Sequence, residues 1–387
     1  MTSRLARLAG GFALLLSALG AQAAPAYTPV TSVPVDVGQT GMTLARDDAG
    51  LLYGVSNTSL ANPFGTVYRV GADGLVTLLH VFSGYDGAGP NTPLARGADG
   101  WFYGATFGGG SGNRGVIFKV SPAGEFALVH TFGADADRGL GAPRAQLVAD
   151  GAGGWYGIGE IGPDRTNVLF QLGADGSVAL LDSFVGPKLG KNVLDLVRTA
   201  DGTLVGTTAL GPQGSFDGAL FSWRPGGRLH TVRAFDSAAE GGSPGGALAI
   251  GRDGAVYGTL ATSATGFGSL WRLGRGGAFN VIHAFGPNDR LGAVPGGLTT
   301  NASGFLYGST AGGGKYGGGT VYSMSITGTG HLLHDFVSFF TDFDACKSDG
   351  CFPAGAPAWL PDGTLWGTTQ QGGDSNFGVF YRIVPKP

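Results

Sequence analysis

The sequence has few charged residues. Asp, Glu, Lys and Arg make up only 13% of the 387 residues, and the net charge of −3 includes no basic run. Soluble domains usually contain about 25% charged residues. Proteins that bind nucleic acid or an anionic membrane surface need a basic patch. The composition therefore argues against both kinds of partner.

Long apolar runs are also lacking beyond the N-terminus, where an exported protein carries its signal. Arg4 and Arg7 precede an apolar stretch over residues 8–19, and Ala21-Gln22-Ala23 has the small-residue pattern of a cleavage site. No later stretch reaches the roughly 18 apolar residues that span a bilayer. We expect residues 1–23 to be a signal peptide and residues 24–387 to form one secreted or periplasmic domain without a membrane span.

Cysteine is scarce, because Cys346 and Cys351 are the only two in the chain. Two cysteines without partner ligands cannot build a structural zinc site. In an exported protein, such a close pair indicates a local disulfide.

The abundant features are glycine and a repeat. Gly 75 and Pro 20 would suggest low complexity in an aperiodic chain. However, an aromatic residue and a later phenylalanine keep a separation of 14 positions six times. A fixed spacing of this kind indicates one copied supersecondary unit. The six pairs are Tyr68 and Phe82, Phe118 and Phe132, Phe170 and Phe184, Phe221 and Phe235, Trp271 and Phe285, and Tyr322 and Phe336.

A marker glycine recurs once in each period of about 50 residues, and helical periodicity is absent. The seven marker positions are Gly54, Gly104, Gly157, Gly206, Gly258, Gly308 and Gly367. Each period contains four short strand-like runs joined by tight turns. The third run is apolar on both faces, so it needs cover on two sides, which radially stacked blades provide. The sequence predicts an all-β, seven-bladed β-propeller with four-stranded blades, rather than a β-solenoid, whose coils are shorter.

The ends of the chain predict how the ring closes. The phenylalanine expected after Tyr381 would fall beyond the last residue, so the seventh blade lacks its outer strand. Residues 27–35 form a strand-like segment with no third strand before it. We expect this N-terminal segment to complete the last blade and remove an exposed sheet edge.

Two segments carry a family resemblance. Phe102-Tyr103-Gly104-Ala105-Thr106, followed by the glycine-rich residues 108–115 and then by 116–120 and 129–132, resembles the GloVer (Gloeo/Verruco) tandem repeat of secreted bacterial proteins, as do residues 306–321. Members often end in surface-anchoring signals, and no such signal is recognisable here. The resemblance implies the repeat type and export, but it implies no settled activity and no site residues.

If the strands meander, all long connections lie on one face, where ligand sites concentrate. We take this face as the candidate site, with catalytic residues unknown. The candidate binding residues on it are Asp86, Asp137, Asp289, Lys315, Tyr316 and Asp374. The last connection also holds Asp342, Asp344 and Asp349, whose carboxylates could bind Ca²⁺, the only cofactor indicated.

Other motifs fit structural roles better. His80, His130, His283 and His334 occupy one repeat position on outer strands, so they cannot converge on a catalytic centre. His230 and His331 are off this register, and neither shows a nucleophile partner. The Gly-x-Ser-x-Gly pattern at residues 241–245 lacks the strand-to-helix setting of a nucleophile elbow. The Gly-x-Gly-x-x-Gly pattern at residues 312–317 lacks the following helix of a dinucleotide site.

The sequence leaves two functions open. A binding scaffold would engage a glycan, a peptide or an envelope protein through the long-loop face. Alternatively, a polysaccharide-active lyase or hydrolase would use acids and aromatic side chains of the same loops, including Tyr85, Tyr316 and Phe377. Paired glycosidase carboxyls need a separation of roughly 5–10 Å, and the sequence alone does not give this distance.

Overall fold

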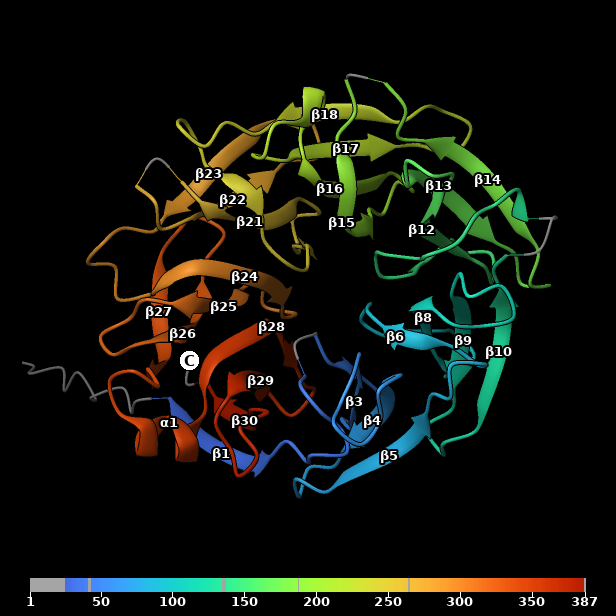
Figure 1. Cartoon of the computed structure of the whole chain (residues 1–387). Coiled ribbons are helices and arrows are strands. Elements are labelled where there is room, and N and C mark those ends of the chain that lie inside the picture. The colour runs from blue at the N-terminus through green and yellow to red at the C-terminus, as the bar shows by residue number, and fades with distance from the viewer. Residues whose placement is uncertain (1–24, 41–42, 134–136, 187, 264, 386–387) are drawn as a thin grey trace, which may run out of the picture.

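The computed structural model describes residues 25–40, 43–133, 137–186, 188–263 and 265–385, so the signal peptide expected at residues 1–23 lies outside the described part. Seven antiparallel sheets follow one another around a central axis in chain order (Figure 1). In each sheet the first strand is innermost and the fourth is outermost. The predicted all-β, seven-bladed propeller with four-stranded blades is confirmed.

The blades are numbered from the N-terminus. Blade 1 holds β2 (Ala45–Arg46), β3 (Leu52–Ser56), β4 (Thr66–Val70) and β5 (Val76–Val81); blade 2 holds β6 (Ala88–Pro90), β7 (Ala95–Arg96), β8 (Phe102–Gly108), β9 (Val116–Val120) and β10 (Phe126–Thr131); blade 3 holds β11 (Val148–Ala149), β12 (Trp155–Ile161), β13 (Thr166–Leu172) and β14 (Val178–Ser183). Blade 4 holds β15 (Lys191–Arg198), β16 (Leu204–Leu210), β17 (Ala219–Trp223) and β18 (His230–Ala234), with the short 3₁₀ turn η2 (Pro212–Gly214) between β16 and β17.

The remaining blades follow the same order. Blade 5 holds β19 (Gly242–Pro244), β20 (Ala249–Ile250), β21 (Val256–Thr262), β22 (Ser269–Leu273) and β23 (Phe279–Ala284); blade 6 holds β24 (Ala293–Thr300), β25 (Leu306–Gly312), β26 (Gly317–Met324) and β27 (Gly330–Val337); blade 7 holds β28 (Cys351–Trp359), β29 (Leu365–Gln371), β30 (Val379–Val384) and, from the N-terminus, β1 (Ala26–Ser32).

Each marker glycine lies opposite a large aromatic ring on the next strand. Gly308 pairs in register with Tyr322, and a Cβ on Gly308 would lie 2.5 Å from the Tyr322 Oη. Gly258 pairs with Trp271, and a Cβ there would lie 2.3 Å from the indole. The rings therefore lie across the glycine backbone. The repeat keeps glycine in the second strand because the aromatic residue of the third strand occupies the space of its side chain.

The ring closes as predicted. β1 pairs antiparallel with β30, so the N-terminal segment supplies the outer strand of blade 7, and the blue and red ends of the chain lie side by side in Figure 1. Pro29 pairs with Tyr381, next to a shift in register. An outer strand tolerates this proline because its outward edge needs no ladder hydrogen bond.

Two details differ from the sequence prediction. The expected absence of helix is wrong at one place, because α1 (Phe343–Asp349) lies in the connection before β28. The innermost run of blade 2, which the sequence pattern places at residues 93–96, is preceded by a further short strand, β6, which pairs with the far end of β8. The Gly-Pro-rich composition of residues 87–90 shows no alternation of apolar and polar residues, so the pattern does not reveal this strand.

The topology defines two faces. Turns after the first and third strands form the short-turn face, whereas the connections from second to third strands and from blade to blade form the long-loop face. The innermost strands of all seven blades line a central channel of about 510 Å³. Buried aromatic and aliphatic side chains fill the spaces between neighbouring blades. No helix in the described part of the chain is long and apolar enough to cross a membrane.

Candidate functional site

Three of the predicted binding acids are partners of the outer-strand histidines. Their carboxylates lie 2.7–3.0 Å from the Nε2 atom of a histidine in the same repeat unit. The pairs are Asp86 with His80, Asp137 with His130, and Asp289 with His283. Each pair belongs to a different blade and joins its outer strand to the following connection. The structure therefore does not bring these acids together.

Burial and local hydrogen bonds act on the charges of the pair of His80 and Asp86. Burial lowers the pKa of His80 although the Asp86 carboxylate acts in the opposite direction. For Asp86, burial would raise the pKa, but hydrogen bonds donated by the Ser83 amide and hydroxyl, together with His80, hold it below the usual value. Asp86 is thus an ionised group that stabilises its own connection.

The acids expected to bind calcium have other partners. The Asp342 carboxylate caps α1 by accepting a hydrogen bond from the Ala345 amide, at 3.0 Å. Asp344 is exposed in the first helical turn. The Asp349 carboxylate lies 2.9 Å from His334 Nε2, which repeats the histidine pairing of the other blades. Within the described residues, no three His, Cys, Asp or Glu side chains gather as a metal site.

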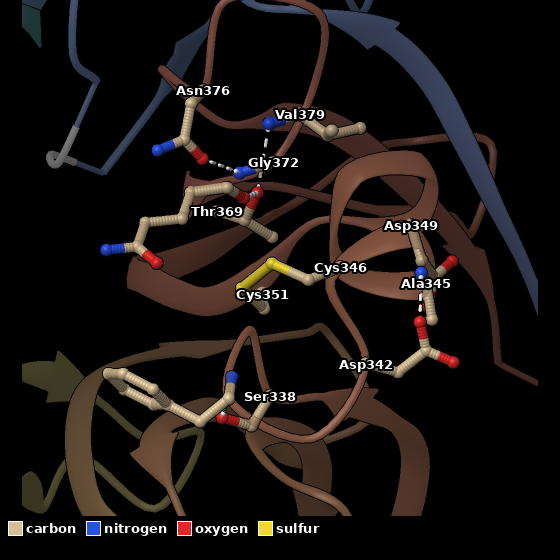
Figure 2. Close-up of a disulfide and its surroundings, with 12 residues drawn as sticks. Ser338, Asp342, Ala345, Cys346, Asp349, Cys351, Thr369, Gly372, Asn376 and Val379 are labelled. Atoms are coloured by element: carbon tan, nitrogen blue, oxygen red, sulfur yellow. Dashed lines mark hydrogen bonds between the residues drawn. A yellow bond between two sulfur atoms is a disulfide. The ribbon is translucent and has the colours of Figure 1, made fainter.

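The disulfide expected between Cys346 and Cys351 is present. Cys346 is the buried residue of α1, and Cys351 opens β28, the innermost strand of blade 7. Figure 2 shows the disulfide between the helix and the end of the blade, where Thr369 accepts a hydrogen bond from Val379 and Asn376 accepts one from Gly372. The helix also accepts a hydrogen bond at the Lys347 carbonyl from the Gly373 amide, at 2.8 Å. The connection that contains α1 is therefore held in place by the disulfide to β28 and by the hydrogen bond from Gly373.

Lys315 and Tyr316 lie beside this connection. The Tyr316 carbonyl accepts hydrogen bonds from the Ser338 amide, at 3.1 Å, and from the Thr341 hydroxyl, at 3.4 Å. Lys315 Nζ lies 2.9 Å from the Tyr316 hydroxyl. Two backbone segments far apart in sequence are thus held together at the edge of the long-loop face.

Three phenylalanines complete this region. The ring of Phe339 lies edge-on to Phe340 and Phe343, with centroid distances of 5.7 Å and 5.0 Å. Phe340 is 90% exposed and Phe343 is also exposed. We call Lys315, Tyr316, Phe339, Phe340 and Phe343 the aromatic loop cluster. Sequence analysis identified its first two members, but it missed the phenylalanines because they lie in an insertion outside the repeat.

The last predicted binding residue, Asp374, lies elsewhere. Its carboxylate accepts a hydrogen bond from the Ser32 hydroxyl at 3.3 Å, and its amide donates to the same hydroxyl oxygen at 3.2 Å. Asp374 therefore joins the connection between β29 and β30 to the end of β1, at the closure of the ring.

Sequence analysis also missed a polar pair on the short-turn face. His230, which was expected to lack a nucleophile partner, lies with its Nε2 atom 3.0 Å from the Ser222 hydroxyl. The two residues pair in register across the hairpin from β17 to β18. The pairing of residues across the hairpin places Ser222 opposite His230, and this pairing could have been worked out from the sequence.

Solved structures with a similar fold include an enzyme and an extracellular domain. Virginiamycin B lyase from Staphylococcus aureus is 13% identical, with a TM-score of 0.60 over 93% of this chain and 99% of the lyase. The extracellular domain of the hybrid two-component system BT4673 from B. thetaiotaomicron is 10% identical, with a TM-score of 0.60 over 92% of this chain. The chain spans only 39% of the length of that domain. At these identities the likeness concerns the fold alone.

No curated protein matches the sequence. The family model of the Gloeobacter/Verrucomicrobia repeat, in contrast, matches residues 38–265 and 160–346, which together extend over most of the ring. The match covers the marker glycines and aromatic residues of the first six blades. The chain belongs to the Gloeobacter/Verrucomicrobia repeat family.

Proposed function

We propose that this protein is a secreted or periplasmic binding scaffold that engages a glycan, a peptide or another envelope partner through its long-loop face. The aromatic loop cluster is the central contact of this proposal. The cluster presents aromatic side chains and the Lys315 ammonium group on a loop that the disulfide and hydrogen bonds hold in place. Its residues form no catalytic arrangement.

The observation that carries the proposal is the distribution of exposed aromatic side chains. Eight are exposed among the described residues, and seven of them lie in or next to the long connections. These seven are Phe64, Tyr85, Phe107, Phe216, Tyr316, Phe340 and Phe343, whereas Phe305 alone lies on the short-turn face. Aromatic side chains are enriched at interaction surfaces, so their concentration on one face is typical of such a surface. The bias thus favours binding through the long-loop face.

The rigidity of the cluster favours the same function. The disulfide closes α1 onto β28, and the Tyr316 carbonyl accepts two hydrogen bonds from the neighbouring segment. A surface that is ordered before binding loses less conformational entropy when the partner arrives. The disulfide also fits an oxidising compartment outside the cytosol.

The geometry favours binding over the polysaccharide-active alternative. Glycosidic chemistry needs two carboxyls that face each other across the substrate. Asp86, Asp137 and Asp289 lie in three different blades, and each carboxylate is bound to its own histidine. None of these three acids is placed to share a substrate with another.

The test uses the mature chain, residues 24–387, on glycan and peptide arrays, followed by calorimetry with each ligand found. Truncating Phe340 or Tyr316 to Ala should weaken binding by tenfold or more, because a central aromatic contact contributes about 2 kcal/mol or more. Phe305→Ala on the opposite face is the matched control and should leave affinity unchanged.

Three results would contradict the proposal. One is the absence of any ligand on the arrays, and another is a loss of affinity for Phe305→Ala that equals the loss for Phe340→Ala. The third is turnover of a polysaccharide by the mature chain, which would support the enzymatic alternative.

A further inference from the structure

One position of the repeat carries a long polar side chain on the short-turn face in most blades. It follows the aromatic residue of each third strand and faces the fourth strand of the same blade. The seven residues at this position are Arg69, Lys119, Gln171, Ser222, Arg272, Ser323 and Arg382. Five of them are long side chains and two are serines.

The long side chains reach across the short-turn face. Arg69 donates a hydrogen bond to the Pro122 carbonyl in the next blade, at 3.3 Å. Arg272 binds the Asp253 carboxylate in the turn between the first two strands of its blade, at 2.7 Å. Gln171 binds Asp150 in the same way in blade 3, at 2.7 Å.

Ser222 is too short for such a contact, and a pocket of about 560 Å³ lies between blades 4 and 5. Ligand sites in proteins usually measure about 300–1,000 Å³ and combine apolar walls with a few convergent polar groups. The apolar wall of this pocket consists of Val205, Val232, Val256 and Leu273. Three of these, Val205, Val256 and Leu273, are buried in the contact between the blades.

The polar groups of the pocket carry a net positive charge. Its one carboxylate, Asp201, already accepts hydrogen bonds from the Thr199 hydroxyl, at 2.6 Å, and the Thr203 amide, at 3.2 Å. The Thr199 contact is the largest cause that lowers the pKa of Asp201 to about 2, so the carboxylate stays ionised. Arg224 lies 3.4 Å from Asp201 and balances its charge.

Arg275 supplies the excess cation. It lines the pocket from the hairpin between β22 and β23, and it forms no ion pair with the described residues. The Ser222 hydroxyl and the His230 ring, 3.0 Å apart, add a hydrogen-bonding pair on the opposite side. Apolar walls with one uncompensated cation suit a small molecule that has an apolar body and a single negative charge.

We propose that the pocket between blades 4 and 5 binds a small carboxylate with an aliphatic or aromatic body. Arg275 receives the carboxylate, Ser222 and His230 offer a further hydrogen bond, and the valines and Leu273 contact the body. This site lies on the face opposite the aromatic loop cluster and does not depend on the proposed function of that cluster.

The experiment measures binding of hexanoate and benzoate to the mature chain by ligand-detected NMR and calorimetry. Hexanamide and benzamide are matched neutral probes. The imidazole signal of His230, assigned with His230→Gln, reports occupancy of this pocket. We expect the acids to shift this signal and to bind about tenfold more tightly than the amides, because a hydrogen bond between ionised groups is stronger than one between neutral groups.

Two variants test the geometry. Ser222→Arg gives blade 4 the long side chain that blade 5 has at this position. The new arginine should bind Asp201 as Arg272 binds Asp253, and it should abolish binding of acids and amides alike. Arg275→Gln should remove the preference for acids over amides. Arg252→Gln, an arginine of the neighbouring turn that does not line this pocket, should change neither property.

The proposal is overturned if the acids do not bind, if they bind no more tightly than the amides, or if binding survives Ser222→Arg. Melting curves check that each variant is folded. If Ser222→Arg does not fold, Arg275→Gln provides the test. An unchanged preference of this variant for acids over amides also overturns the proposal.

Discussion

The Tyr27 ring of β1 stacks on the His334 ring of β27, with centroids 3.5 Å apart and planes inclined by 10°. The same contact joins two other neighbouring blades of the propeller. His80 of blade 1 stacks on Phe126 of blade 2, with ring centroids 3.5 Å apart and planes inclined by 5°. The Tyr27 hydroxyl also donates a hydrogen bond to the Asp349 carbonyl. The closing strand thus reproduces a contact between neighbouring blades of the continuous chain, although its two partners are 307 positions apart.

Replacing Tyr27 should weaken the closure of the ring. Tyr27→Ala should lower the free energy of unfolding by about 3 kcal/mol, in the range for loss of a large packed aromatic side chain. Tyr27→Phe keeps the stacking and should cost only about 1 kcal/mol, the net value of one hydrogen bond. Urea unfolding gives both values. Phe126→Ala is the matched variant at a continuous junction, and equal stability of wild type and Tyr27→Ala would contradict the closing role.

The marker glycines should not tolerate a methyl group. Gly308→Ala places a Cβ 2.5 Å from the buried Tyr322 hydroxyl oxygen, so the ring must move within a filled core. We expect the free energy of unfolding to fall by about 1–3 kcal/mol, which is typical of overpacking. Gly286→Ala, where no atom lies within 4 Å of the new Cβ, is the control. Similar urea midpoints for the two variants would refute this explanation of the repeat.

The sequence was sufficient to predict the propeller because the residues that recur in each repeat are those that pack against each other in each blade. A glycine opposite an aromatic ring, as at Gly258 and Trp271, is required in every blade, so the pattern counts the blades and even reveals the missing strand of the last one. Positions outside the repeat carry no such information. The helix α1 and the phenylalanines of the aromatic loop cluster belong to an insertion, and only the fold determines what they contact.

The candidate acids show a different limit of sequence reasoning. Asp86 and Asp289 were expected at the rim, and they do lie in blade-to-blade connections, but each carboxylate binds a histidine of the outer strand. His80 and His283 are each followed by their acid six positions later, and His130 is followed by Asp137 seven positions later, so these three pairs could have been recognised from the sequence. The pocket beside Ser222 was harder to foresee, since it arises from a side chain that is shorter than its counterparts.

Loss of the disulfide should loosen one connection and leave the ring intact. With Cys346 and Cys351 both replaced by Ser, we expect the free energy of unfolding to fall by about 2 kcal/mol, the chain-entropy value for so short a loop. Amide exchange should quicken over residues 342–350 because these residues depend on the bridge for their fixed position. Far-UV circular dichroism should not change. Wild-type protein under reducing conditions should behave alike, and exchange that quickens around the whole ring would contradict a local role.

Asp195 should make the folded protein less stable as the pH rises. Its carboxylate is buried on the inner strand β15 and accepts a hydrogen bond from the Leu248 amide, at 2.6 Å. Burial raises its pKa from 3.8 to about 6, against the effect of the backbone hydrogen bonds. Between these two values the folded protein holds a proton that the unfolded chain has lost. The free energy of unfolding therefore falls as pH rises through this window and changes no further above about pH 6.

Asp195→Asn removes this titration and keeps an oxygen that can accept from Leu248. The free energy of unfolding of the variant minus that of wild type should rise by about 2–2.5 kcal/mol between pH 4 and 7, since one pKa unit corresponds to about 1.4 kcal/mol and the unfolded chain is already partly ionised at pH 4. Urea unfolding at stepped pH measures this difference and cancels the other titrating groups. Asp201→Asn is the control, because the lowered pKa of that carboxyl confines its effect to more acidic conditions. A difference for Asp195→Asn that stays constant from pH 4 to 7 would show that the carboxyl titrates normally in the folded protein.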